Sequence, residues 1–187
     1  MSKKGQISDC YKVECSQKNN EGVKVMKRLN CYISQAITLL RQFDTKDVDE
    51  YLKFYEHIEK CLNKNHKVNI FHPIKEDSNK RSNEIYWRDL AEIDKADFLV
   101  AEISVVSWGV GQELTYAIIK GKPILALYNT KSRFKLSEMV SGSGLRIRTY
   151  NGKSDEWKEQ IARHIAGFMP EVKQYFYLRE RVCAKIP

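Results

Sequence analysis

A short segment of the sequence places a carboxylic acid beside two glycines: Ser107-Trp108-Gly109-Val110-Gly111-Gln112-Glu113. Gly109 and Gly111 allow the backbone to approach a ligand closely. A helix predicted to begin at about Gln112 would direct its free N–H groups toward the same place, where an anion can bind. Glu113 would then lie in the first turn of that helix, with its carboxylate facing the ligand.

Position alone does not make Glu113 a catalytic residue. An acid in a first turn stabilises the helix dipole by about 0.3–1 kcal/mol, and this structural role is the simpler explanation. The two glycines form no Gly-x-Gly-x-x-Gly pattern, so a dinucleotide-binding fingerprint is not supported.

Three other side chains can join Glu113 only if the fold brings them there. Tyr32 lies near the end of a predicted strand, His72 follows another strand, and Asp89 lies in the middle of a predicted helix. Taken singly, each has an ordinary structural explanation: a core tyrosine, a structural histidine and a solvated helix acid. Their convergence at one edge of a sheet is what would indicate a site.

The elements that would position these residues alternate along the chain. The helix over 48–62 is indicated by Tyr51, Phe54, Tyr55, Ile58 and Leu62, which share one face at helical spacing. Further helices are predicted over 84–95, 112–119, 135–140 and 157–168. Strands are predicted over 29–33, 68–71, 98–103, 123–127 and 145–149.

This alternation predicts an α/β fold: a doubly wound, mostly parallel, five-stranded sheet with helices on both faces, Rossmann-like or flavodoxin-like. The run over 98–103 is almost continuously apolar, as in a strand buried on both sides. In such sheets ligands bind beyond the carboxyl ends of the strands. We expect one folded domain over 29–168, preceded by a flexible basic arm over 1–28 and followed by a tail over 169–187.

The composition limits the class of protein. The chain has 187 residues, a net charge of +8 and no apolar run long enough to span a membrane. The start lacks the apolar stretch of a signal peptide, so we expect a cytoplasmic location, with the nucleus as an alternative. The charge favours an anionic partner, but the basic residues are scattered among acids, and nucleic acid is the less favoured choice.

The cysteines and histidines do not indicate a metal centre. The five cysteines include no Cys-x-x-Cys pair, and the four histidines lack ligand spacing. We therefore expect reduced thiols, no metal and no cofactor.

Several segments together resemble the 2'-deoxynucleoside 5'-phosphate N-hydrolases, relatives of the nucleoside 2-deoxyribosyltransferases. The resemblance covers about residues 29–168. It rests on Ser-x-Gly-x-Gly-x-Glu at the glycine segment and on the runs 89–91, 96–102, 121–127 and 136–139.

The resemblance implies roles for individual residues. Glu113 matches the nucleophile that attacks C1' of the sugar, while Asp89 and Tyr32 match residues that assist departure of the base. The remaining matches contact the substrate: Ile37, His72, Ser107, Gly109, Gly111, Ser137 and Met139. Among these, Ser137 and Met139 match a segment that reaches the active site of the other subunit of a homodimer.

The sequence departs from this family in the loop after the first strand. Where the family has a Gly-Ser-Ile-Arg-like run that helps hold the 5'-phosphate, this chain reads Gln35-Ala36-Ile37-Thr38. A serine hydroxyl and a guanidinium are therefore missing, and Arg41 is the nearest substitute. We expect weaker or differently built phosphate recognition.

The leading hypothesis is a hydrolase that cleaves the N-glycosidic bond of (deoxy)nucleoside 5'-monophosphates through a covalent intermediate on Glu113. The first alternative is a nucleoside 2-deoxyribosyltransferase, in which a second base replaces water as the acceptor. The other is a non-catalytic nucleotide-binding or interaction domain. The sequence does not decide which base or sugar is preferred.

Overall fold

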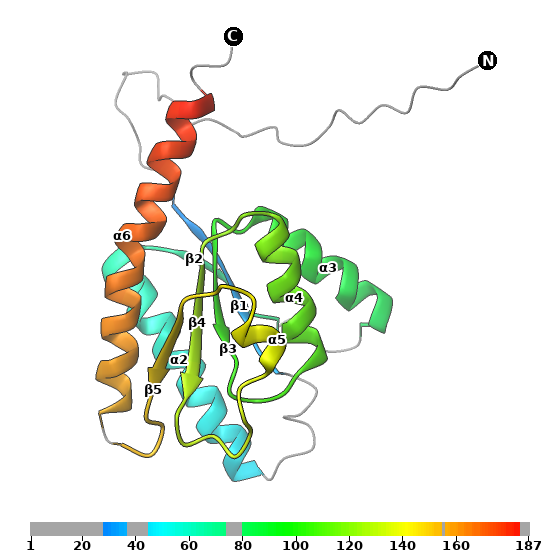
Figure 1. The fold of residues 1–187 in the computed structure, drawn as a ribbon, viewed down its shortest axis with the longest axis vertical. Helices are drawn as coiled ribbons and strands as arrows, with labels where there is room; N and C mark the ends of the chain where they lie inside the picture. Colours follow the sequence, from blue (N-terminus) through cyan, green and yellow to red (C-terminus); the bar gives the residue numbers. More distant parts are fainter. Residues whose placement is uncertain (1–27, 37–44, 74–79, 155, 184–187) are drawn as a thin grey trace, which may run out of the picture.

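The computed structural model describes residues 28–36, 45–73, 80–154 and 156–183 (Figure 1). All but the last residue of the predicted basic arm lies outside these ranges. Ile37, Thr38 and Arg41 from the loop after the first strand also lie outside them.

Five parallel strands form one sheet in the order β2-β1-β3-β4-β5. The strands are β1 (Asn30–Ser34), β2 (Asn69–Phe71), β3 (Phe98–Glu102), β4 (Ile124–Asn129) and β5 (Ile147–Tyr150). β3 lies at the centre and all of its residues are buried, which explains its nearly continuous apolar sequence. The predicted doubly wound, flavodoxin-like sheet is confirmed.

Helices cover both faces of this sheet (Figure 1). They are α2 (Thr45–His66), α3 (Ser82–Lys95), α4 (Trp108–Ile119), α5 (Glu138–Ser141) and α6 (Trp157–Cys183). On one face, α2 and α6 pack against Ile33, Val100 and Leu127, and on the other, α3 and α4 pack against Tyr32, Leu99 and Ala101. Alternate strand residues point to opposite faces, so the two cores divide each strand between them.

Among the predicted helix boundaries, two that differ from the structure bear on the site and the core. α4 begins at Trp108 rather than near Gln112, because Ser107 is its N-cap and accepts a hydrogen bond from the Val110 N–H. Glu113 therefore lies in the second turn and not in the first. Stabilisation of the helix dipole, which acts mainly in the first turn, is therefore a weak explanation for an acid at position 113.

α6 continues far beyond the predicted end at Phe168 and reaches Cys183. Met169 and Val172 are fully buried against the α2 side of the sheet, so the apolar face of the helix persists past that point. Pro170 lies inside the helix and is exposed. Proline removes one helical hydrogen bond, and here the packing of its buried neighbours offsets that loss.

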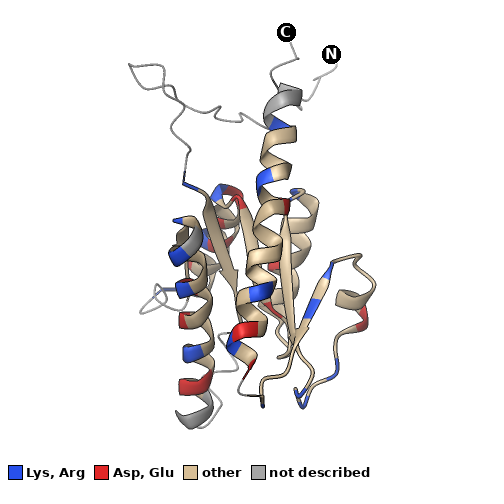
Figure 2. Ribbon diagram, turned by 90° about the vertical axis from the view of Figure 1, so that its left-hand side faces the viewer, with Lys and Arg blue, Asp and Glu red and all other residues tan. Residues whose placement is uncertain are grey.

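Basic and acidic residues are interspersed along α2 and α6 rather than gathered in a patch (Figure 2). No helix among the described residues is long and apolar enough to cross a membrane.

Candidate active site

The site lies where the strand order reverses. β1 is flanked by β2 and β3, so the chain leaves β1 in one direction and returns on its other side. In flavodoxin-like sheets the crevice at this point, beyond the carboxyl ends of the strands, is where ligands bind. α4 begins shortly after β3 ends and packs on the same side as α3.

Glu113 on α4 is held by two hydroxyl groups from β1. The Tyr32 hydroxyl donates to Glu113 Oε1 at 3.0 Å, and the Ser34 hydroxyl donates to Oε2 at 2.5 Å. Tyr32 and Ser34 are two residues apart on one strand, so they face the same helix. Both are fully buried, and both carboxyl oxygens are thus fixed in direction.

The surroundings of Glu113 alter its proton affinity. Burial is the main cause that raises the pKa of Glu113 to about 8, and the negative charge of Asp89 adds to it. The hydrogen bonds from Ser34 and Tyr32 and the charge of Arg88 act in the opposite direction. A carboxyl group with this pKa exists in both protonation states near neutral pH, which is typical of functional sites.

Asp89 reaches the same place from α3. It is buried, and Arg88 Nε and Nη2 donate to its Oδ1 at 2.9 and 2.6 Å. The Arg88 guanidinium also lies 5.5 Å from the centre of the Phe71 ring, which stacks on Tyr32. Asp89 is therefore not the solvated helix acid that its sequence neighbours suggest.

Tyr32 remains a phenol in this environment. Burial raises its pKa well above the ordinary value, and the charges of Glu113 and Asp89 raise it further. The group therefore keeps its proton near neutral pH and can donate a hydrogen bond. Tyr32, Asp89 and Glu113 lie together, from three different elements.

His72 lies on the other side of the sheet. Its ring packs against Tyr55 of α2, its Nε2 lies 3.0 Å from Gln35 Oε1, and its Nδ1 lies 3.2 Å from Glu59 Oε1. Phe71, the preceding residue, points toward Tyr32 instead. The alternation along β2 separates His72 from the group around Glu113, and no contact between the two is present among the described residues.

The glycine segment forms the first turn of α4. The Ser107 hydroxyl is engaged as the helix cap. Gly109 is exposed, Gly111 is partly exposed, and a Cβ at either position would meet no close contact. Neither glycine is required by the packing of this chain alone, which leaves room for a ligand near them.

Ser137 and Met139 lie at the short helix α5. Ser137 is the N-cap of α5 and is exposed, and Met139 is 86% exposed. Ile37, the remaining predicted substrate contact, lies outside the described residues.

Sequence reasoning missed Ser34 and Arg88. Ser34 was detectable, because a residue two positions after Tyr32 on a strand faces the same side. Arg88 gave no signal beyond its place next to Asp89, since neighbouring helix residues ordinarily point in different directions.

Residues 42–151 match the sequence model of the family described as Nucleoside 2-deoxyribosyltransferase. The chain belongs to this family. The matched range runs from α2 to β5, so it includes Asp89 on α3 and Glu113 on α4.

Individual relatives carry more specific names. The chain is 37% identical over 89 residues to a mouse protein named 5-hydroxymethyl-dUMP N-hydrolase, covering 46% of this chain and 51% of the relative. The human protein of the same name is 33% identical over 88 residues, covering 46% of this chain and 51% of the relative. The chain spans about half the length of the curated relatives it matches.

Solved structures with a similar arrangement include a CMP N-glycosidase of Clostridium botulinum. The sequences are 14% identical, the TM-score is 0.49, and the match covers 73% of this chain and 97% of the other. A 2-desoxiribosyltransferase from Leishmania mexicana gives 13% identity and a TM-score of 0.46, covering 73% and 98%.

Proposed function

We propose that this member of the nucleoside 2-deoxyribosyltransferase family hydrolyses the N-glycosidic bond of (deoxy)nucleoside 5'-monophosphates. The observation that carries the proposal is the Glu113 carboxyl group, with one oxygen held by Tyr32 and the other by Ser34 at the switch point of the sheet. The names of the mouse and human relatives, which are nucleotide N-hydrolases, support hydrolysis.

In the first step, a Glu113 carboxylate oxygen forms a bond to C1' as the bond between C1' and the base nitrogen breaks. The electron pair of that bond leaves with the base, and the sugar passes through an oxocarbenium-like state. Tyr32 and Ser34 orient the nucleophile, and Asp89 and Tyr32 support protonation of the departing base. In the second step, water attacks C1', which releases the sugar phosphate and regenerates Glu113.

Recognition of the 5'-phosphate involves Ser107, Gly109 and Gly111 at the start of α4 in this proposal. Backbone N–H groups at a helix N-terminus suit an anion. In the loop after β1, Gln35 and Ala36 stand where the family has a Gly-Ser pair that helps hold the phosphate. The Ala36 N–H already donates to the Tyr51 hydroxyl at 3.0 Å. Ile37 is the remaining proposed substrate contact, whereas His72, predicted as another, packs against α2 instead. We therefore expect a reduced preference for the monophosphate over the nucleoside.

A transferase reaction is the second candidate, because the family description itself names one. The same glycosyl intermediate would then be captured by a second nucleobase rather than by water. Adding a free base of a different kind to the reaction distinguishes the two, since only a transferase forms the new nucleotide.

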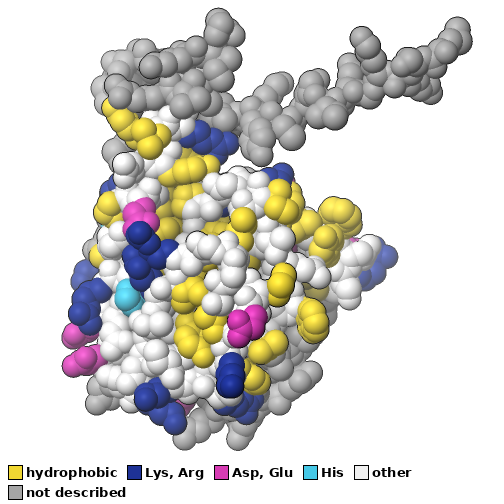
Figure 3. All heavy atoms as spheres, viewed as in Figure 1, with side chains coloured by type: hydrophobic (Ala, Val, Ile, Leu, Met, Phe, Trp, Pro, Cys, Tyr) yellow, Lys and Arg dark blue, Asp and Glu magenta, His cyan; other side chains and the backbone are white. Residues whose placement is uncertain are grey.

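We further propose a homodimer in which Ser137 and Met139 reach the partner's site. Large hydrophobic side chains are exposed around α3, α4 and α5: Trp87 at 67%, Trp108 at 90%, Ile119 at 71% and Met139 at 86%. Hydrophobic groups gather on the face of the molecule that carries these helices (Figure 3). An accumulation of large, exposed apolar side chains is typical of an interaction site.

The decisive experiment measures free base released from a panel of deoxynucleoside monophosphates, ribonucleotides and the corresponding nucleosides. Glu113→Gln keeps the size of the side chain and one of its two acceptor oxygens but removes the nucleophile. We expect it to lower base release by at least about a thousandfold, in line with the loss of other essential catalytic groups.

The matched control is Glu159→Gln, which changes an exposed glutamate on α6. Full activity of the control together with loss in Glu113→Gln supports the assignment. If Glu113→Gln retains most of the wild-type rate, Glu113 is structural and the proposal is wrong. If the wild type binds nucleotides but releases no base, the non-catalytic alternative holds.

A further inference from the structure

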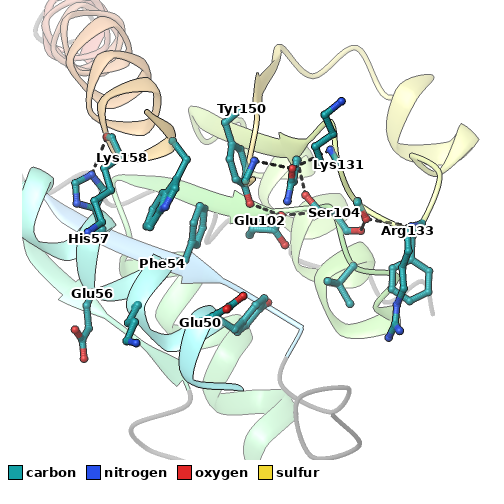
Figure 4. Close-up of a pocket in the computed structure, with 18 of the residues that line it drawn as sticks. Glu50, Phe54, Glu56, His57, Glu102, Ser104, Lys131, Arg133, Tyr150 and Lys158 are labelled. Atoms are coloured by element: carbon teal, nitrogen blue, oxygen red, sulfur yellow. Dashed lines mark hydrogen bonds between the residues drawn. The ribbon is translucent and has the colours of Figure 1, made fainter. Parts of the chain in front are cut away.

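A cavity opens on the opposite side of the sheet from Glu113. Its volume is about 770 Å³, within the range of small-molecule sites. It lies between α2 and the start of α6 on one side and the segment after β4 on the other (Figure 4). None of the proposed catalytic or substrate-binding residues lines it.

The floor of this cavity is Glu102, the last residue of β3. The side chain is buried, with 2% of the residue exposed. Its Oε1 accepts hydrogen bonds from the Ser104 N–H at 3.1 Å and from the Tyr150 hydroxyl at 3.3 Å. Its Oε2 is equally buried and has no hydrogen-bond partner among the described residues.

A buried acceptor without a partner is destabilising, so such groups in folded proteins usually indicate a missing donor. The free oxygen belongs to a side chain that lines the cavity (Figure 4). Oε2 is covered in this structure, so a ligand in the cavity with an N–H donor on its edge would reach it once the side chains that cover it move aside. The proton affinity of the group is also unusual, since burial raises the pKa of Glu102 to about 7.

The walls are aromatic. Phe54 stacks between Tyr150 and Trp157, with ring centres 5.2 and 5.7 Å away, and Tyr51 and Phe134 also line the space. Aromatic faces favour offset stacking on another flat ring. Phe54 and Tyr150 are buried in this stack, so a planar heterocycle in the cavity would pack against the partly exposed Tyr51, Phe134 and Trp157.

The rim is basic. Five cationic side chains line the cavity, against the two glutamates of α2 and the buried Glu102: Lys53, Lys60, Lys131, Arg133 and Lys158. Lys158 lies on one side and Lys131 and Arg133 lie on the other (Figure 4). Within the described part of the chain, neither Lys131 nor Lys158 forms an ion pair. Lysines on opposite sides suit a group with a charge near −2 and several oxygens, such as phosphate.

We propose that this cavity is a second ligand site that takes a phosphorylated, planar heterocycle of the nucleoside monophosphate class. The ring packs on the partly exposed aromatic side chains of the wall, Tyr51, Phe134 and Trp157, and the phosphate lies between Lys131 and Lys158. An N–H donor on the edge of the ring binds Glu102 Oε2. The site is separate from that of Glu113, because Val100 and Glu102 face α2 and α6 whereas Ala101 faces α3 and α4.

Trp157 provides a local optical probe. The chain has three tryptophans, and the other two, Trp87 and Trp108, do not line the cavity. A Trp87→Phe/Trp108→Phe variant reports on Trp157 alone. Adding Glu113→Gln prevents turnover during the titration, so the measurement does not depend on the proposed hydrolysis. AMP is the probe, since its exocyclic amine supplies an N–H donor, and adenosine is the same ring without phosphate.

We expect saturable changes in Trp157 emission with AMP. Lys131→Ala/Lys158→Ala should weaken AMP binding at least tenfold while leaving adenosine almost unchanged. Glu102→Gln should weaken the binding of both ligands at least tenfold. The substitution replaces the acceptor Oε2 by an amide N–H₂ group, which cannot accept a hydrogen bond from the ligand. The control is Lys64→Ala/Lys173→Ala, which removes the same charge from exposed lysines that do not line the cavity.

The proposal is overturned if AMP at millimolar concentration leaves Trp157 emission unchanged, or if both lysine pairs weaken AMP equally. The second result would show only a general effect of net charge. Circular dichroism checks that Glu102→Gln is folded, and if it is not, the comparison of the lysine pairs with AMP and adenosine decides alone. Base release by the wild type is measured separately, so failure of one proposal leaves the other intact.

Discussion

At the scale of single residues, the protonation of Glu113 controls the proposed chemistry. Its pKa is raised to about 8, chiefly by burial, so most molecules carry a neutral Glu113 at pH 6 and an ionised one at pH 9. Only the carboxylate is a nucleophile. We therefore predict that kcat/KM for base release rises with pH and levels off above about pH 8.

The measurement is a pH–rate profile of kcat/KM, which reports the ionisation of the free enzyme. A rate that falls over the same range would mean that neutral Glu113 acts as an acid. The nucleophilic role proposed for Glu113 would then be wrong.

Ser34 is a positioning residue whose effect can be separated from a merely structural one. It donates to Glu113 Oε2 at 2.5 Å, and this hydrogen bond lowers the pKa of Glu113. Hydrogen bonds to charged groups contribute about 1.5–3 kcal/mol, which corresponds to roughly 10- to 100-fold in rate. We predict that Ser34→Ala lowers kcat/KM by this factor and moves the midpoint of the pH profile to higher pH.

Ser143→Ala, which changes an exposed serine after α5, is the matched control and should alter neither quantity. A slower Ser34→Ala enzyme with an unshifted pH profile would contradict the proposed contact with the nucleophile.

At the scale of elements, a substitution in α6 can test whether the chain beyond Phe168 belongs to the core. Met169 is fully buried, although it lies past the end that periodicity predicts for this helix. Truncating a buried methionine leaves a cavity and typically costs about 2–5 kcal/mol. We predict that Met169→Ala lowers the free energy of unfolding by this amount in urea titrations.

Lys173→Ala, on the exposed side of the same helix, should change the free energy of unfolding by less than about 0.5 kcal/mol. Equal effects of the two substitutions would show that the distal half of α6 does not pack on the sheet in solution.

At the scale of the whole molecule, the exposed apolar surface around α4 and α5 predicts self-association. Trp108, 90% exposed, is the largest of these side chains, and a charge in its place would be desolvated in an interface. We predict that the wild type sediments as a dimer at micromolar concentration and that Trp108→Asp sediments as a monomer.

Loss of the dimer in Trp108→Asp would support association through the surface around α4 and α5. Lys153→Ala, which changes an exposed residue after β5 and likewise lowers the net charge by one, controls for the altered charge. A wild-type monomer with full activity would rule out the shared-site arrangement.

The sequence by itself determined the order of strands and helices, the parallel sheet and the family resemblance. These depend on local patterns: apolar runs for buried strands, helical spacing in α2, and the glycine segment with its glutamate. Tyr32, Asp89 and Glu113 could be singled out on the same grounds, because each occupies a position that the family motif marks.

Only the tertiary structure decided what surrounds these residues. The contact of Ser34 with Glu113, the link between Arg88 and Asp89, and the separation of His72 from both depend on which side of a strand or helix faces which neighbour. The raised pKa values of Glu113 and Glu102 depend on burial by elements distant in the sequence. The true length of α6 likewise depends on packing, since Met169 and Val172 extend a core that the sequence shows only as isolated apolar residues.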